Sequence, residues 1–287
     1  MGITRDELIG HADRYLEALA ANEPRRIAAP NCRCTENFQH LRIGQGMWRT
    51  VTGRKPGGHY FTDPASGQVG FFGVVTERGG PAAMRQGGGE AAAMIALRLK
   101  VEHDLITEAE TLAVRGGGIL FNPDLFLNRD RSGFLEVVPP AERLPRHELV
   151  RISNLYFEAI EQSNGDLVPV TEECGRVENG FQTTRNPDAQ TEVGRMGVAE
   201  QMNRGAVRHI AGCVQRRVWA VDEEHQTALW FFFFDHPGDL GSVPGRVPFG
   251  YPNYMPAVEA FKVRNGVITN IEALIDIYPY GISSGWS

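Results

Sequence analysis

The 287-residue sequence lacks the features that mark several large classes of protein. It has no apolar run close to the ~20 residues that a membrane-spanning helix needs, and its first residues lack the apolar segment of a secretory signal. Lys and Arg total 29 against 35 Asp and Glu, a formal charge of −6, so there is no basic excess for binding nucleic-acid phosphates. These absences predict a cytoplasmic protein that binds neither membranes nor nucleic acid.

Cysteine is also scarce, and the usual metal and nucleotide motifs are missing. The four cysteines are Cys32, Cys34, Cys174 and Cys213. The spacing of the first two is not that of a zinc or thioredoxin motif, so we expect reduced, buried thiols. The eight His residues are scattered, and the Gly-rich segment near Gly87 lacks the Gly-Lys-Ser/Thr phrase of a phosphate loop. We therefore predict no metal and no cofactor.

What the sequence does contain is an internal repeat. LIGHADRYLEAL (residues 8–19) resembles LVRISNLYFEAI (residues 149–160), with Tyr15 aligned to Tyr156. Soon afterwards CRCTENFQ is matched by CGRVENGFQ, which aligns Glu36 with Glu178 once one glycine is inserted.

A third match closes each copy. LKVEHDLITEAETL (residues 99–112) aligns without gaps to FKVRNGVITNIEAL (residues 261–274). Because the three matches occur in the same order, they indicate a tandem duplication, with a period too long for a solenoid. We predict a first unit at residues 1–112, a connecting segment at 113–145 and a second unit at 146–287.

Both copies follow one plan of helices first and strands after. The first opens with Thr4-Arg5-Asp6-Glu7, a capping box that starts a helix, and the second has apolar residues at helical spacing from Leu149 to Ile160. Asn265-Gly266 is a hairpin turn, and His103-Asp104 stands at the same place in the first copy. The pattern predicts an α+β fold with helices packed on an antiparallel meander.

This order of elements, with the hairpin phrase FKVRNGVITNIEAL, resembles the nuclear transport factor 2-like, or SnoaL-like, family. The resemblance covers roughly residues 5–112 and 146–279. It implies two cone-shaped units, each a curved antiparallel sheet around helices, with a deep apolar pocket. Members include cofactor-free isomerases, dehydratases, polyketide cyclases and lyases as well as binding modules. Two-copy members similar to this chain include lyases that release formaldehyde from lignin-derived diarylpropanes.

Polar side chains in such a pocket would perform acid–base chemistry, because burial moves the pKa values of carboxylates and His toward neutrality. Glu36 and Glu178 follow the helices in both copies; the alternative is a structural turn. Lys55, His59 and Tyr60 could supply a donor, a base and a phenol, or form a solvated basic loop. We expect Arg216 or Arg217 to meet a carboxylate such as Glu178 or Asp235. The candidate catalytic residues are Glu36, Lys55, His59, Tyr60, Glu178, Arg217, Asp235 and His236, and the candidate substrate-binding residues are Trp219, Trp230, Phe232 and Tyr254.

The function expected from these observations is a cofactor-independent lyase acting on a small, hydrophobic, hydroxylated aromatic molecule. One alternative is an isomerase, dehydratase or polyketide cyclase that uses the same residues. Another is a non-catalytic module for binding or scaffolding. The sequence leaves open which copy holds the working site, and whether the chain forms a homo-oligomer.

Overall fold

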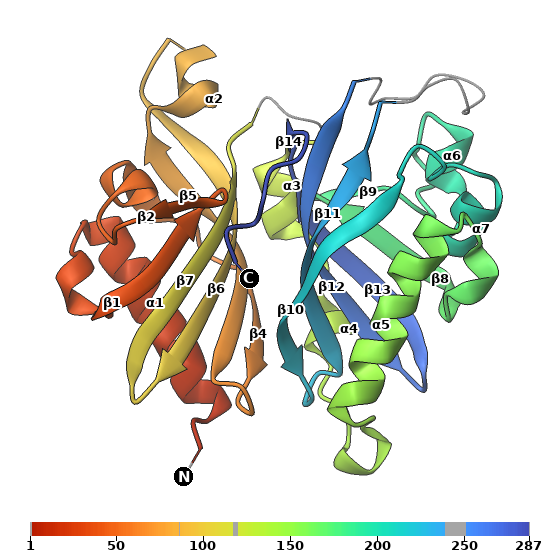
Figure 1. Ribbon diagram of the computed structural model, residues 1–287, viewed down its shortest axis with the longest axis horizontal. Helices are drawn as coiled ribbons and strands as arrows, with labels where there is room; N and C mark the ends of the chain where they lie inside the picture. The colour runs from red at the N-terminus through yellow and green to blue at the C-terminus, as the bar shows by residue number, and fades with distance from the viewer. Residues whose placement is uncertain (1, 86, 117–119, 239–250, 287) are drawn as a thin grey trace. The chain divides into compact units, whose positions relative to one another are not determined.

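The computed structural model describes residues 2–85, 87–116, 120–238 and 251–286. The chain divides into two compact units, Met1–Asn128 with Ser283–Ser287, and Arg129–Ile282. Each unit combines helices with one seven-stranded sheet in the described residues (Figure 1). The expectation of two tandem α+β units is therefore confirmed.

The first unit contains, in chain order, α1 (Arg5–Ala21), the 3-10 helix η1 (Pro24–Arg26), β1 (Ala28–Glu36), β2 (Gln39–Leu41), η2 (Gly46–Arg49), β3 (Val51–Arg54), β4 (His59–Asp63), β5 (Gln68–Arg78), α2 (Gly80–Arg85), β6 (Glu90–Glu102), β7 (Leu105–Val114) and α3 (Pro123–Asn128). The second unit contains α4 (Ser132–Leu135), η3 (Pro140–Glu142), α5 (Arg146–Glu161), η4 (Gly165–Leu167), β8 (Val170–Glu178), β9 (Phe181–Gln182), α6 (Glu192–Arg195), α7 (Val198–Asn203), β10 (Gly212–Asp222), β11 (Thr227–His236), β12 (Asn253–Arg264), β13 (Val267–Ile275) and β14 (Tyr278–Pro279).

The two sheets share a strand order but are mixed, which corrects the prediction of purely antiparallel sheets. The first runs β2-β1-β7-β6-β5-β3 with β4 beside β5, and the second runs β10-β11-β12-β13-β8-β9 with β14 beside β12. Strand β1 lies parallel to β7, and β8 lies parallel to β13. No hairpin joins the members of either pair, so the turn signals that correctly indicated the meander say nothing about this pairing.

The local turn signals act as predicted. The Thr4 hydroxyl accepts from the Glu7 amide at 3.3 Å, and the Glu7 carboxylate accepts from the Thr4 amide at 2.8 Å, which completes the capping box. Between β12 and β13 the turn residue Asn265 has φ 51°, and His103 has φ 51° between β6 and β7. Both lie in the left-handed region that such two-residue turns require.

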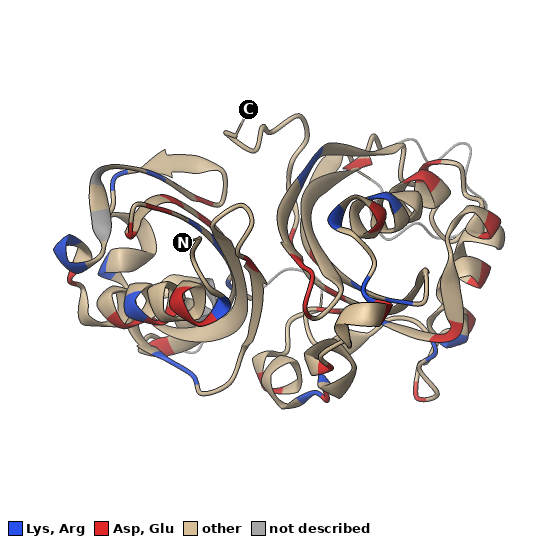
Figure 2. Cartoon of the chain, turned by 90° about the horizontal axis from the view of Figure 1, so that it is seen from below, with Lys and Arg blue, Asp and Glu red and all other residues tan. Residues whose placement is uncertain are grey.

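Each sheet is curved, and one long helix lies on the inner side of the curve (Figure 2). In the second unit the Trp230 indole donates to the Ser153 hydroxyl of α5 at 2.8 Å, and the rings of Phe157 and Phe232 lie 4.5 Å apart. Because alternate residues of a strand share a face, Trp230 and Phe232 mark the face of β11 that is turned toward α5. This inner face also carries Glu259, which lies opposite Trp230 on the neighbouring strand.

The asparagine of the repeated Glu-Asn pair has a structural role in both units. Asn179 donates to the carbonyl of Ile275 at 2.8 Å and accepts from the Ile275 amide at 2.9 Å. Asn37 makes the same two bonds with Ala113, at 3.1 and 2.7 Å. Both asparagines have positive φ, 49° and 46°. Each therefore holds the end of a parallel strand pair together.

Replacing Asn179 by Ala is expected to destabilise the second unit by about 2–4 kcal/mol, because it leaves a buried amide and carbonyl of Ile275 without partners. Asn179→Gly tolerates the positive φ and separates the backbone contribution from the lost hydrogen bonds. Urea unfolding of both variants measures the effect. Wild-type stability in Asn179→Ala would contradict this role.

Candidate functional site

The second unit buries a carboxylate on the inner face of its sheet. Glu259 lies on β12 directly opposite Trp230 of β11, so it faces α5 as Trp230 does. Its exposed fraction is 1%. Within 3.5 Å neither carboxylate oxygen has a hydrogen-bond partner among the described residues, and the Tyr156 phenol is a side chain that donates toward the carboxylate. A buried acid in this position is costly when ionised, so its protonation state is set by its surroundings.

Those surroundings bring the pKa of Glu259 close to neutral pH. Burial raises the pKa of Glu259 to about 8, and the neighbouring Glu178 carboxylate raises it as well. The Arg176 guanidinium and the nearby Tyr156 phenol lower this pKa and so oppose part of the shift. A carboxyl group with such a pKa can both give and take a proton near physiological pH.

A phenol held by a guanidinium lies beside this acid. Arg176 of β8 donates to the Tyr156 oxygen at 3.1 Å, to Gln201 at 2.8 Å and to Thr183 at 3.1 Å. Its Nε also lies 3.6 Å from Glu178. Burial raises the pKa of Tyr156 well above 10, so the phenol stays protonated. Because Arg176 donates to the phenol oxygen, the phenol proton is available to a carboxylate or to a substrate oxygen.

The equivalent positions of the first unit carry no such set. The repeat aligns Glu259 with Leu97, Arg176 with Cys34, and Tyr156 with Tyr15. Strand pairing supports this alignment, because Leu97 lies opposite Phe71 as Glu259 lies opposite Trp230. Leu97 and Tyr15 belong to the buried hydrophobic cluster of the first unit.

Little space remains inside the first unit at this place. A hollow lined by Tyr15, Cys34, Glu36 and Trp48, among others, has a volume of about 20 Å³, which is room for about one water molecule. Of the two equivalent positions, the one in the second unit carries the buried acid, so the candidate site is the cluster of Tyr156, Arg176, Glu178 and Glu259.

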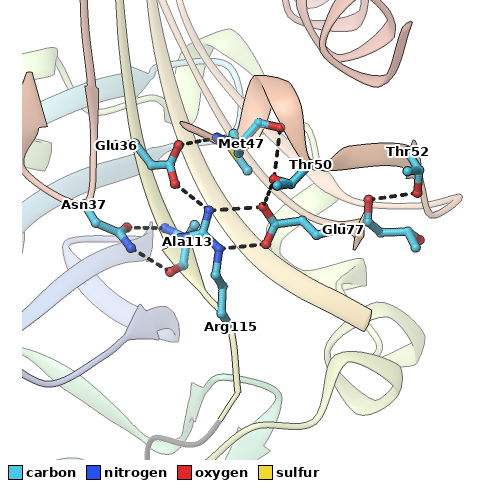
Figure 3. A network of polar contacts seen from close by, with 9 residues as sticks. Glu36, Asn37, Met47, Thr50, Thr52, Glu77, Ala113 and Arg115 are labelled. Carbon is cyan, nitrogen blue, oxygen red and sulfur yellow. Dashed lines mark hydrogen bonds and ion pairs between the residues drawn. The ribbon is translucent and has the colours of Figure 1, made fainter. Parts of the chain in front are cut away.

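Glu36, a predicted candidate, is tied into an ion network at the end of β1 (Figure 3). Arg115 donates to Glu36 at 2.5 Å and to Glu77 at 2.7 Å. The other oxygen of Glu36 accepts from the Met47 amide at 2.7 Å. Both oxygens of Glu36 are thus bonded within this network. The counterpart of Glu36 in the second unit, Glu178, forms its ion pair with Arg176 of the candidate site.

The predicted group of Lys55, His59 and Tyr60 does not converge. Lys55 is exposed, and His59 is 3% exposed with its ring 4.1 Å from that of Phe61. The Tyr60 hydroxyl bonds to Asp13 and accepts from Arg54 at 2.5 Å. Burial raises the pKa of Tyr60 to about 12.

In the second unit the partner of Arg216 is Glu161, not Glu178 or Asp235. This ion pair joins strand β10, which carries Arg216, to the end of helix α5, which carries Glu161. Arg217 lies with its guanidinium 4.7 Å from the centre of the Phe231 ring, on the outer face of the sheet. Asp235 also points to that face, because it alternates with Phe234 on β11.

His236 shares the inner face with Glu259 but lies far along the strand. It stands six positions after Trp230, which corresponds to ~20 Å of strand. It stacks on His209 with ring centres 5.2 Å apart. Burial, with the adjacent His209, lowers the pKa of His236 to about 4, so this imidazole is neutral at pH 7. His236 therefore lies outside the Glu259 cluster.

The four predicted aromatic contacts divide between the two faces. Trp230 and Phe232 lie on the inner face beside Glu259. Trp219 stacks on Phe231 with ring centres 5.9 Å apart, and Tyr254 lies 5.4 Å from Phe233, both on the outer face. Trp230 and Phe232 are therefore the aromatic candidates that accompany the acid.

Sequence reasoning missed Glu259, Arg176 and Tyr156 as a site. One signal was present: AVEAF places a single acid in an apolar strand, where the first copy reads ALRL with Leu97. When one repeat has an acid where the other has an apolar residue, packing of the core does not explain the acid, and this difference indicates a functional group.

The described residues contain no group of three or more His, Cys, Asp and Glu side chains placed to hold a metal ion. Within the same ranges, no helix is both long and apolar enough to cross a membrane.

A family profile described as "Domain of unknown function (DUF8021)" matches residues 142–275, inside the second unit. The comparison with curated proteins found no match.

Solved structures similar to this chain share little sequence with it. They include a nuclear transport factor 2-like protein from Burkholderia xenovorans LB400, with 9% identity, a TM-score of 0.31, and coverage of 39% of this chain and 92% of the other. A protein provisionally named a polyketide cyclase, from Xanthomonas campestris pv. campestris, has 19% identity, a TM-score of 0.31, and coverage of 45% and 90%. BvnE pinacolase from Penicillium brevicompactum has 16% identity, a TM-score of 0.29, and coverage of 39% and 88%. At these TM-scores the similarities carry no argument, and the fold assignment stands on the strand order and register.

Proposed function

We propose that the second unit is an acid–base enzyme for a small organic substrate, in which Glu259 moves the proton. The observation that carries this proposal is a buried carboxyl that has no hydrogen-bond partner within 3.5 Å among the described residues and whose pKa burial raises to about 8. Leaving such a group unpaired costs stability, and groups with strongly shifted pKa values concentrate at functional sites.

Each neighbouring side chain has a separate role in the proposed reaction. The Glu259 carboxylate takes a proton from the substrate, which is worth about 10²–10⁴-fold in rate. The Tyr156 hydroxyl, oriented by Arg176, donates to the oxygen on which negative charge develops. Glu178 keeps the pKa of Glu259 high by like-charge repulsion. These steps need no group beyond the side chains named.

The more specific form of the proposal is a lyase that acts on a diaryl-propanediol, with Trp230 and Phe232 contacting the rings. Glu259 takes the proton of the primary hydroxyl, and the bond between the carbinol carbon and its neighbour breaks to release formaldehyde. That electron pair forms a carbon–carbon double bond as the benzylic hydroxyl leaves. Protonation of the leaving hydroxide gives water, so the products are formaldehyde, a diaryl alkene and water.

Incubating metal-free protein with a diaryl-propanediol tests this reaction, with formaldehyde and alkene measured together. Equal amounts of the two products are expected. A product with the same mass as the substrate would contradict the lyase reaction and favour an isomerase or a cyclase. Saturable binding of the diol without any product, in correctly folded protein, would favour a binding module and contradict the enzymatic proposal.

A further inference from the structure

A pair of thiols in the first unit plays no part in the proposed reaction. Cys32 and Cys34 are alternate residues of β1, and their sulfur atoms lie 3.5 Å apart. A disulfide needs a sulfur separation of about 2.05 Å, so the two atoms must approach by about 1.5 Å more. The two cysteines are thus close to bonding distance within a single strand.

Strand β1 is irregular over the stretch that contains Cys32 and ends just before Cys34. Ala28 pairs with Ile106 and Arg33 with Glu108, so β1 advances five residues while β7 advances two. Bulged strands bend and twist more than regular ones. A strand bent in this way can bring side chains that share a face toward each other, at the point where Cys32 and Cys34 meet.

The two thiols differ in character. Cys34 is the buried member, at 9% exposed, whereas Cys32 is half-buried. The hydrogen bond between the two sulfurs lowers the pKa of Cys34 and raises the pKa of Cys32. Cys34 is therefore the sulfur that ionises first, and the thiolate is the reactive form of cysteine.

Cys34 also lines the hollow of about 20 Å³ described above, together with Tyr15, Thr35 and Glu36. Its size suits one molecule close to water in size, and its mixed lining includes Thr35, Glu36 and Gln45, whose side chains can hydrogen-bond a small polar molecule. Hydrogen peroxide meets both conditions, whereas a bulky organic hydroperoxide does not fit.

We propose that Cys32 and Cys34 form a reversible dithiol–disulfide pair that hydrogen peroxide oxidises through the hollow beside Cys34. The Cys34 thiolate attacks one peroxide oxygen, the O–O bond breaks, and hydroxide leaves, so that Cys34 becomes a sulfenic acid. The Cys32 sulfur then attacks the Cys34 sulfur, which releases water and forms the disulfide. Two thiols are oxidised, and one peroxide is reduced to two waters.

The second unit provides matched controls. Cys174 is the repeat counterpart of Cys32, but the position two residues later is Arg176 instead of a cysteine. Cys174 and Cys213 are 0% and 3% exposed, and burial raises the pKa of each thiol. Neither should react with peroxide while the protein remains folded.

The experiment treats the full chain with hydrogen peroxide and measures intact mass and free thiols. We expect loss of two hydrogen atoms and two thiols per chain, mapping to Cys32 and Cys34, with full recovery after dithiothreitol. Cys32→Ser should instead accumulate a sulfenic acid at Cys34 that dimedone traps. Cys174→Ser and Cys213→Ser should behave as wild type.

Four results would contradict the proposal. The first is an unchanged thiol count at peroxide concentrations that oxidise free cysteine. The second is a disulfide between chains instead of within one. The third is equal oxidation in the Cys32→Ser/Cys34→Ser double variant. A rate for cumene hydroperoxide equal to that for hydrogen peroxide would also contradict entry through the hollow, because we expect hydrogen peroxide to react at least about tenfold faster. None of these measurements depends on the Glu259 reaction.

Discussion

Replacing Glu259 by Gln is expected to lower kcat/KM by about 100-fold or more, because the amide keeps the size of the side chain but cannot accept the substrate proton. In the wild type, kcat/KM should rise with pH, reach half its maximum near pH 8 as the buried carboxyl ionises, and level off at higher pH. Glu259→Gln should abolish this dependence. The measurement is a pH series with the substrate identified by the product assay.

Glu36→Gln is the matched control for this experiment. Glu36 is an acid of the first unit, where Arg115 and the Met47 amide hold it, so its loss should change kcat/KM by less than about twofold. Glu178→Gln should act differently from both, shifting the pH midpoint downward because one negative neighbour of Glu259 is removed. Full activity in Glu259→Gln, or an equal loss in Glu36→Gln, would place the chemistry elsewhere.

The stability of the second unit should fall as pH rises from about 4.5 to about 8. In this interval the unfolded chain loses the Glu259 proton, whereas the folded chain keeps it until the pH approaches about 8. The loss of folding stability caused by Glu259 is therefore absent below about pH 4.5. It is complete above about pH 8, where it reaches a few kcal/mol at most. Glu259→Gln lacks this cost, since its amide does not ionise.

Urea unfolding of wild type and Glu259→Gln at pH 5, 7 and 9 measures the difference. We expect the variant to gain stability over wild type steadily from pH 5 to 9. Infrared difference spectra provide a second readout, because the wild type at pH 6 should show a protonated-carboxyl band that the variant lacks. A constant stability difference across the series would mean that Glu259 ionises normally.

Several elements of the fold were predictable because their causes are local. The capping box at Thr4 and the turn at Asn265 act within a few residues, so their sequence signals survive in any tertiary context. The repeat was detectable for a different reason: positions such as Asn37 and Asn179 hold strands together in the same way in both units. A shared structural requirement keeps both copies alike.

The candidate site was predictable only in part. Glu178 lies in the cluster and stays a prediction, as do the other candidate residues. Cross-strand placement, which joins β8, β12 and α5, determines that Arg176, Glu259 and Tyr156 meet. No local pattern encodes that meeting, because the three residues come from segments far apart in the chain.

The sequence by itself determined that this chain has two related α+β units, because hairpin turns, caps and apolar periodicity act over short distances. Only the tertiary structure decided that one strand pair in each sheet is parallel, and that Arg176, Glu259 and Tyr156 meet in the second unit. Both outcomes depend on long-range strand pairing. Burial opposite Trp230, and not residue type, is what brings the pKa of Glu259 near neutrality.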